Sequence, residues 1–524
     1  MKRGLFVDVF SREFAFVSLI AVIAVTIGWV GFTASDDQYY YSAALKWLEE
    51  EWYLPDHFGR VRHSISLPIA LSISLFGDRE LAVILPSTVY YFATIGLTFV
   101  CVSRSADRTV AFLACAVFAT FPVVVTAATN ATADIAELFW ASVAFWLFFY
   151  SWQGGRLRAE ALFGCGVALA LAFSGRETVM ALGIFVAGAI LLGHRIGRGQ
   201  IVWVVVGGLA VLGSEALYYA LAGGDPLLRF SLLLNGISSS NDRPVAPAFS
   251  VDSSGSLRVH PLLDPLLLVL ARQFFGLGYW VFFAVLLVAV SGRPSVAAHD
   301  RPAARELQRL ALSAGMIWFL FVVATLWRIK LLGRYYIAPA WLFTVGSAAF
   351  LCVHQTAVTH PRRLWFAVSC VVAANFAGIG LQNNNPRLEE RELAAFAASS
   401  HEPVFTDPYT ARYASEFLHW AGVPPEQVVG APPTDGALYF VVPSRIGAPN
   451  RLTPESMLPA LQVRPEWAVV RRIEGPTALP AFLVPAIRGT TFIPEWLRAK
   501  LAAPRGNLLV VRAVAPRTTR EGPQ

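Results

Sequence analysis

The chain has 524 residues, of which 56% are hydrophobic and only 15% are charged. Soluble domains usually contain about 25% charged residues, so this composition excludes a water-soluble enzyme and indicates a membrane protein. The formal net charge is +7. Because many of the basic residues gather in loops between apolar runs, we interpret this charge as a sign of membrane topology and expect no nucleic-acid partner.

Eleven apolar runs are long enough to cross a bilayer, for which a helix needs roughly 17 to 25 residues. The predicted spans are residues 14–34, 80–102, 109–127, 135–152, 160–175, 178–194, 201–221, 272–291, 309–327, 336–354 and 363–381. The first run is longer than the apolar core of a signal peptide and many more follow it, so we interpret it as a span. The predicted fold class is a polytopic α-helical membrane protein with about 11 transmembrane helices.

The loops predict the orientation of these spans. With a cytoplasmic N-terminus, the inner loops carry an excess of basic residues and the outer loops carry more acidic than basic residues, as the positive-inside rule requires. An odd number of spans then places the C-terminus outside. Only four of the 42 basic residues are Lys, an Arg bias that suggests a bacterium with GC-rich DNA. We therefore expect a multi-pass protein of the bacterial inner membrane.

Residues 383–524 lack long apolar runs and are predicted to form a separate extracytoplasmic domain after a transmembrane domain of residues 1–382. Four stretches have the pattern of strands: PVFTD, ALYFVV, EWAVVRR and NLLVVRAV. The stretch YTARYASEFLHWAG has the 3.6-residue spacing of a helix. This alternation predicts a small α/β domain.

Two predicted outer loops, residues 35–79 and 222–271, are far longer than the roughly 2 to 8 residues that usually connect bundle helices. Long loops on one face of a membrane bundle usually build a functional site there. The chain has no internal repeat, which argues mildly against an inverted-repeat transporter.

The first outer loop begins with two acids, Asp36 and Asp37, ahead of a Tyr-rich segment with an apolar helical stripe. This pattern predicts an interfacial helix that lies on the bilayer. The sequence Ser35-Asp36-Asp37-Gln38 also fits a capping box, which would be a purely structural role. Alternatively, one carboxylate acts as general base for an acceptor hydroxyl. The two roles are compatible.

Further along this loop come Arg60, Arg62 and His63. They could anchor the loop to lipid headgroups. They could also form a phosphate site, because a guanidinium offers a planar fork of donors.

Three more outer loops carry candidate residues. Asp134 and Glu137, at the outer end of the fourth span, could orient an acceptor or help to bind a divalent cation. Arg176 and Glu177 are adjacent, so on a helix they cannot face each other and each needs another partner. A plain interfacial Arg is the alternative there.

The loop WRIKLLGRYYIAPA opposes the positive-inside rule, since it places Arg328, Lys330 and Arg334 on the outer side. An anionic ligand at the outer membrane surface would account for these charges. Arg334 and Tyr335, at the start of the tenth span, are the best placed to meet it.

These segments together resemble the GT-C superfamily of polytopic glycosyltransferases, specifically the branch of protein O-mannosyltransferases and bacterial lipid A aminoarabinose transferases. Asp36-Asp37 with its Tyr-rich helix is similar to the family's Asp-Glu motif. RVRHSISLPIALSISLFGDRELAVILPS resembles the basic-then-proline segment before the second span, and SADRTVAFLACAVFATFPVVVTAATNATADIAELFW resembles the third and fourth spans with their loop acid, Asp134. LLGRYYIAPA is similar to the family's Arg-Tyr-x-x-x-Pro.

One departure from the family concerns the phosphate ligand. Relatives often have Lys-Pro after the first interfacial helix, whereas this chain has Arg60, Arg62 and His63 before Leu67-Pro68. Of these three, we favour Arg62.

The resemblance implies an inverting transfer of a sugar from a polyprenyl-phosphate donor to an acceptor hydroxyl of a glycan, lipid or protein at the outer face. Asp36 would be the base, and Arg62 and Arg334 would have to converge on the donor phosphate near it. No cofactor is implied with certainty, although Asp36, Asp37 and Asp134 could hold a divalent cation through oxygen ligands.

Two other functions fit parts of the sequence. A transporter or flippase of a lipid-linked glycan would also need outer Arg residues, but it would more often carry ionisable residues in the middle of its spans. A membrane scaffold that displays the tail domain would leave the long first loop unexplained.

Overall fold

The structure of the protein is a computed structural model. It describes residues 11–154, 158–193, 195–241, 250–251, 257–258, 301–326, 333–353, 361–382, 387–442, 465–474, 494–495, 498 and 507–514. The chain forms two compact units. The first contains Met1–Trp29, Ser35–Gly77 and Leu81–Gln382, and the second contains Val30–Ala34, Asp78–Glu80 and Asn383–Gln524.

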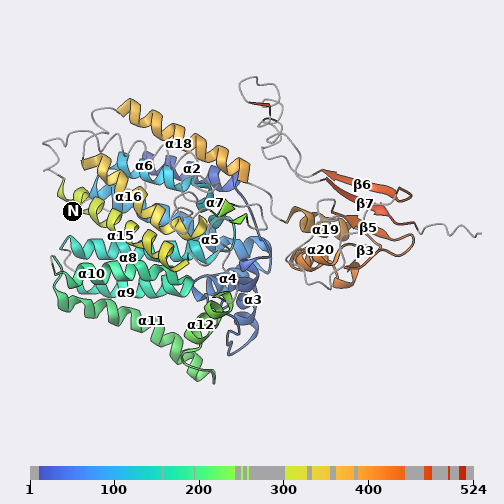
Figure 1. Cartoon of the computed structure of the whole chain (residues 1–524), viewed down its shortest axis with the longest axis horizontal. Coiled ribbons are helices and arrows are strands. Elements are labelled where there is room, and N and C mark those ends of the chain that lie inside the picture. The colour runs from blue at the N-terminus through green and yellow to red at the C-terminus, as the bar shows by residue number, and fades with distance from the viewer. Residues whose placement is uncertain are drawn as a thin grey trace, which may run out of the picture. The chain divides into compact units, whose positions relative to one another are not determined.

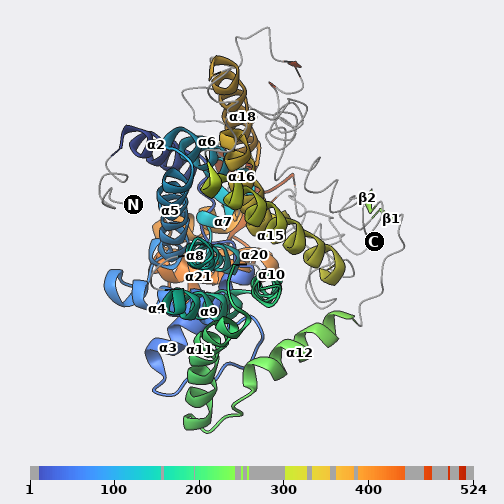
Figure 2. The same ribbon diagram turned by 90° about the vertical axis from the view of Figure 1, so that its left-hand side faces the viewer.

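The first unit is built from helices, many of which run side by side (Figures 1 and 2). Its α-helices are α2 (Arg12–Ile27), α3 (Asp36–Glu49), α4 (His63–Phe76), α5 (Glu80–Ser105), α6 (Arg108–Ala119), α7 (Pro122–Ala128), α8 (Ala133–Trp152), α9 (Arg158–Gly175), α10 (Met180–Leu191), α11 (Ile201–Leu221), α12 (Leu228–Asn241), α15 (Pro302–Leu326), α16 (Ile337–Val353) and α18 (Pro361–Gln382). Short 3-10 turns are η1 (Glu177–Val179), η2 (Arg198–Gln200) and η4 (Gly333–Tyr336), and β1 (Ser250–Val251) pairs with β2 (Leu257–Arg258).

Six of the described helices are long and apolar enough to cross a membrane, or seven if the bent pair α6 and α7 counts as one span. They are α5, α8, α9, the helix through η2 and α11, α15, and the helix through η4 and α16. Helices α2, α10 and α18 cover parts of three other predicted spans. The predicted span 272–291 lies outside the described residues. The structure therefore confirms a helical protein with several apolar spans, while the total of eleven stays a prediction.

The predicted third span, residues 109–127, is bent rather than straight. Helices α6 and α7 meet at an angle of 73°. Pro122 begins α7 and has no backbone N–H to continue the hydrogen-bond ladder of α6, so the chain turns at this point. The bend brings the end of α7 close to η4.

Helices α9 and α11 approach each other closely because each presents a glycine at the contact. A Cβ atom on Gly166 would clash with the Val204 carbonyl oxygen, and one on Gly207 would clash with the Phe163 carbonyl oxygen. Small residues permit this close helix packing in membranes. The contact fixes α11 against α9, and α9 ends at Gly175, directly before Arg176.

The second unit contains a mixed five-stranded sheet with strand order β4-β3-β5-β7-β6. Its strands are β3 (Val404–Phe405), β4 (Val428–Val429), β5 (Leu438–Val441), β6 (Ala468–Glu474) and β7 (Asn507–Arg512). The three strands β4, β3 and β5 are parallel, whereas β7 runs antiparallel to β5 and β6. The unit also contains the helices α19 (Leu388–Ser399), α20 (Pro408–Tyr413) and α21 (Ser415–Trp420) and the turn η5 (Pro425–Gln427). Four of these strands overlap the stretches that the sequence pattern marks as strands, and the single predicted helix is divided into α20 and α21.

Two short segments from early in the chain pack into this second unit. Phe32 contacts the rings of Phe417 and Trp420. Arg391 pairs with Glu80 and donates to the Phe32 carbonyl oxygen at 3.2 Å. The predicted first span, residues 14–34, is therefore too long, because its helix ends at Ile27 and its last apolar residues serve the core of another unit.

Candidate functional site

The two acids of the first loop differ in their surroundings. Asp36 and Asp37 open α3, where negative side chains favour the helix N-terminus. The Asp37 side chain is buried and accepts the Ser35 backbone N–H at 2.5 Å. Ser35 itself makes no side-chain capping bond, so the predicted capping box does not form in its usual sense. Asp36 is half exposed and free of this local role.

Asp36 meets Arg334, which lies 298 residues further along the chain. An Arg334 Nη2 atom is 2.5 Å from an Asp36 carboxylate oxygen. Arg334 belongs to η4, directly before α16, and its Nε atom is 3.8 Å from a carboxylate oxygen of Asp134. One guanidinium therefore lies between two carboxylates.

Asp134 lies in the first turn of α8 and is almost completely buried. It forms an ion pair with Arg176, which precedes η1. The Arg176 guanidinium also lies over the Tyr335 ring, 4.1 Å from the ring centre. Tyr335 thus contributes its aromatic face to a cation, an arrangement that is favourable near a desolvated site.

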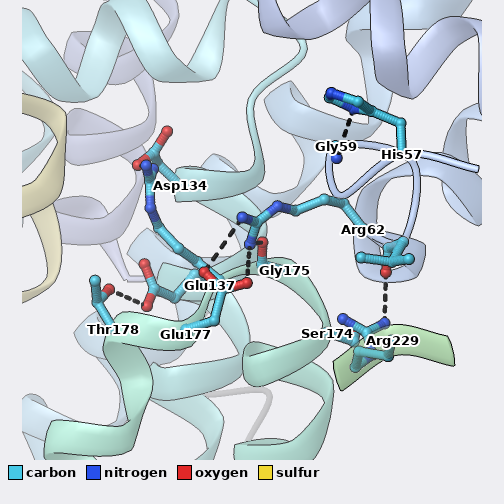
Figure 3. Close-up of polar contacts among 12 residues, drawn as sticks. His57, Gly59, Arg62, Asp134, Glu137, Ser174, Gly175, Glu177, Thr178 and Arg229 are labelled. Carbon is cyan, nitrogen blue, oxygen red and sulfur yellow. Dashed lines mark hydrogen bonds and ion pairs between the residues drawn. The ribbon is translucent and has the colours of Figure 1, made fainter. Parts of the chain in front are cut away.

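Arg62 enters the same region from the end of the first loop. Its guanidinium donates to the Gly175 carbonyl oxygen at 2.5 Å and lies 3.0 Å from a Glu177 carboxylate oxygen, as Figure 3 shows. Burial opposes the charged form of Arg62, but the nearby Glu177 carboxylate outweighs it and raises the pKa of Arg62. In the same region, Glu137 accepts a hydrogen bond from the Thr178 hydroxyl at 2.5 Å.

Tyr40, one turn into α3, is buried, and the charges of the site act on its hydroxyl. Burial raises the pKa of its hydroxyl and the negative charge of Asp36 raises it further, while the positive charges of Arg62, Arg176 and Arg334 oppose the shift. All four charged groups therefore act on one buried side chain. The site thus gathers three guanidinium groups, each beside a carboxylate.

Two of the predicted phosphate ligands have other partners in the structure, and a further candidate from the loop before the tenth span is not described. Arg60 pairs with Asp56 at 2.7 Å. His63 faces Glu215 at 3.0 Å and the Tyr219 hydroxyl at 2.6 Å. Lys330 lies outside the described residues.

The possible divalent cation stays a prediction. Across the described part of the chain, no three His, Cys, Asp or Glu side chains are grouped so that they could hold a metal. Asp36 and Asp134 face guanidinium groups instead. Arg–carboxylate pairing and metal coordination compete for the same oxygen atoms, so a cation would have to displace these arginines.

Sequence reasoning did not select Tyr40, Glu215 or Arg229 as site residues. Glu215 carried a usable signal, because an acid within an apolar run is costly and usually functional. Arg229 had no local signal, since it is one of several basic residues in a long loop.

Part of the chain matches a known protein family. Residues 65–219 match the sequence profile of the dolichyl-phosphate-mannose-protein mannosyltransferase family. This segment includes Asp134, Glu137, Arg176, Glu177 and Glu215. No curated protein sequence matches the chain.

Solved structures of ArnT from Cupriavidus metallidurans share the fold. The apo structure superposes with a TM-score of 0.53 at 13% sequence identity, over 83% of this chain and 94% of that chain. The structure of the same protein bound to undecaprenyl phosphate superposes with a TM-score of 0.50 at 15% identity, over 97% of this chain and 99% of that chain. The family match over residues 65–219 and the shared fold agree with the resemblance to the GT-C superfamily that the sequence motifs indicate.

Proposed function

We propose that the protein is a membrane glycosyltransferase that moves a sugar from a polyprenyl-phosphate donor to an acceptor hydroxyl at the extracytoplasmic face, with inversion. The contact between Arg334 and Asp36 is the observation that carries this proposal. It places a phosphate-binding type of side chain beside a candidate base, within a fold shared with an undecaprenyl-phosphate-binding protein.

The site residues can divide the chemistry between them. The guanidinium groups of Arg334, Arg176 and Arg62 would bind the donor phosphate through charge-assisted hydrogen bonds. The acceptor oxygen attacks the anomeric carbon while the bond from that carbon to the phosphate oxygen breaks, and polyprenyl phosphate leaves with the electron pair. Asp36 takes the proton of the acceptor hydroxyl. A single displacement of this kind inverts the anomeric carbon.

Donor binding would rearrange the ion pairs of the site. Arg334 lies 2.5 Å from a carboxylate oxygen of Asp36, and a phosphate on Arg334 would compete with this carboxylate. Release of Asp36 would leave it available to the acceptor. We therefore expect the donor to bind before the acceptor.

A transfer assay with the purified full-length protein tests the proposal. Mass spectrometry of copurifying lipids should detect undecaprenyl phosphate or its glycosylated form. The identified donor should then lose its sugar to an acceptor fraction from the membrane, with release of the lipid phosphate. A protein that neither binds undecaprenyl phosphate nor releases it from a sugar-linked donor would contradict the proposal.

The competing function is transport of a lipid-linked glycan. A flippase would move a labelled lipid-linked sugar between the leaflets of a proteoliposome and leave the sugar-phosphate bond intact. A transferase breaks that bond in detergent, where no leaflets exist. The same purified protein can therefore be used to distinguish the two functions.

The orientation of the second unit is also proposed as extracytoplasmic, where it would contribute to acceptor contact. A Ser399→Cys variant without native cysteines should react with a membrane-impermeant thiol reagent in intact cells, because Ser399 is exposed at the end of α19. A Gln153→Cys variant, in the predicted cytoplasmic loop after α8, is the matched control and should react only after lysis. The reverse pattern would overturn the assigned topology.

A further inference from the structure

A second buried charged cluster contacts the two chain neighbours of Arg62, Val61 and His63. Glu215 of α11 accepts from Arg229 Nε, which is 2.9 and 2.8 Å from its two carboxylate oxygens. The same carboxylate lies 3.0 Å from His63 Nε2 and accepts the Tyr219 hydroxyl at 2.7 Å. We refer to Glu215, Arg229 and His63 as the Glu215 cluster. The proposed reaction uses none of its members.

The Glu215 cluster holds the chain on both sides of Arg62. Arg229 Nη2 donates to the carbonyl oxygen of Val61 at 2.5 Å. On the other side, His63 begins α4 and its ring is held by Glu215. Arg62 itself has non-helical backbone angles and makes no side-chain capping bond to its own helix. Its side chain is therefore free to reach Gly175 and Glu177 from a backbone that its neighbours fix.

Stability alone gives a poor account of these charges. Removing a carboxylate and a guanidinium from water costs free energy that their attraction often only balances, and well-packed apolar residues serve a fold equally well. In a membrane protein the alternative apolar packing is even easier to supply, so ionisable groups at such positions usually have a function. Arg229 is only 2% exposed, and it comes from α12, a helix of the long fourth outer loop.

We propose that Arg229 and Glu215 are positioning residues that fix Arg62 for the donor phosphate, an inference that rests on the proposed function. Arg229 sets the backbone of Val61, Glu215 sets His63, and together they determine where the Arg62 guanidinium emerges. A phosphate ligand gains affinity when its binding groups are already ordered, because less conformational entropy is lost on binding. The fourth outer loop thus acts on the site by fixing the backbone next to Arg62.

The test measures the dissociation constant of undecaprenyl phosphate for the full-length protein in detergent. The double variant Glu215→Gln, Arg229→Gln removes both charges and so avoids leaving one buried charge alone. Its Kd should rise about tenfold, within the range of coupling expected for residues that share a network. In an Arg62→Ala background the same double substitution should have no further effect, because the residue through which it acts is gone. The single variant Arg229→Lys keeps a positive charge at this position and should lose less affinity than the double variant.

The control is Arg301→Met, which breaks the ion pair of Arg301 with Asp107, 3.1 Å apart and remote in sequence from Arg62. It should leave the Kd unchanged. A folded double variant with unmodified affinity would overturn the positioning role. An equal loss of affinity in the Arg62→Ala background would overturn it too, since Arg229 would then contact the phosphate itself. If the unmodified protein fails to bind undecaprenyl phosphate, the proposed function fails first.

Discussion

Replacement of Asp36 by Asn is expected to lower kcat for sugar transfer at least about 100-fold, because the variant loses the proposed general base. Asn has nearly the same size and suits a helix N-terminus as well as Asp does. The Asp36 side chain is 44% exposed, so the substitution opens no buried space and the protein should fold normally. Transfer should be measured with saturating donor, so that a change in kcat is separated from a change in binding.

The same variant should bind undecaprenyl phosphate at least as tightly as the unmodified protein. Asp36 competes with the phosphate for Arg334, and Asn removes the charge of this competitor. The matched control is Asp37→Asn, since Asp37 is 1% exposed and accepts the Ser35 N–H, a bond that an amide oxygen can also accept. Its effect on kcat should be equal or milder. Full transfer activity of the Asp36→Asn variant would leave the acidic pair with a structural role only.

Hydropathy locates most helices of this chain but cannot tell which unit an apolar residue serves. Val30 and Phe32 continue the apolar run of α2, yet they are buried in the second unit. Hydropathy averaged over neighbouring residues cannot distinguish a membrane span from the core of the second unit, because both favour the same residue types. Pro122, in contrast, is a local signal, and the bend between α6 and α7 could have been predicted from it.

In the candidate site, too, the sequence predicts which residues need partners but not which residues those partners are. Adjacent Arg176 and Glu177 predict separate partners, and the structure pairs them with Asp134 and Arg62 respectively. The identity of those partners depends on the packing of α8 and α9 against the first loop, which no short pattern encodes. His63 was grouped with Arg62 because the two are neighbours in sequence. It begins a helix, however, and its side chain is directed to Glu215 instead.

Replacement of Arg334 by Ala is expected to weaken donor binding and to slow transfer together. The leaving phosphate gains charge as its bond to the sugar breaks, so a cation beside it stabilises the transition state more than the ground state. Loss of one such donor group typically costs about 100- to 1,000-fold in kcat. Asp36 would lose its partner in this variant, but it is 44% exposed and can be solvated, so folding should not fail for that reason.

Arg62→Ala should have the same two effects, whereas Arg60→Ala is the matched control, because Arg60 pairs with Asp56 rather than with the site carboxylates. Kd for undecaprenyl phosphate and kcat for transfer should be measured for all three variants. Arg334→Lys should restore only part of both quantities, since an ammonium group is a point charge and lacks the planar fork that binds two phosphate oxygens at once. Complete rescue by Lys would indicate that Arg334 acts by charge alone. Unchanged Kd and kcat in Arg334→Ala would remove this residue from the donor site and would leave its contact with Asp36 as a structural ion pair.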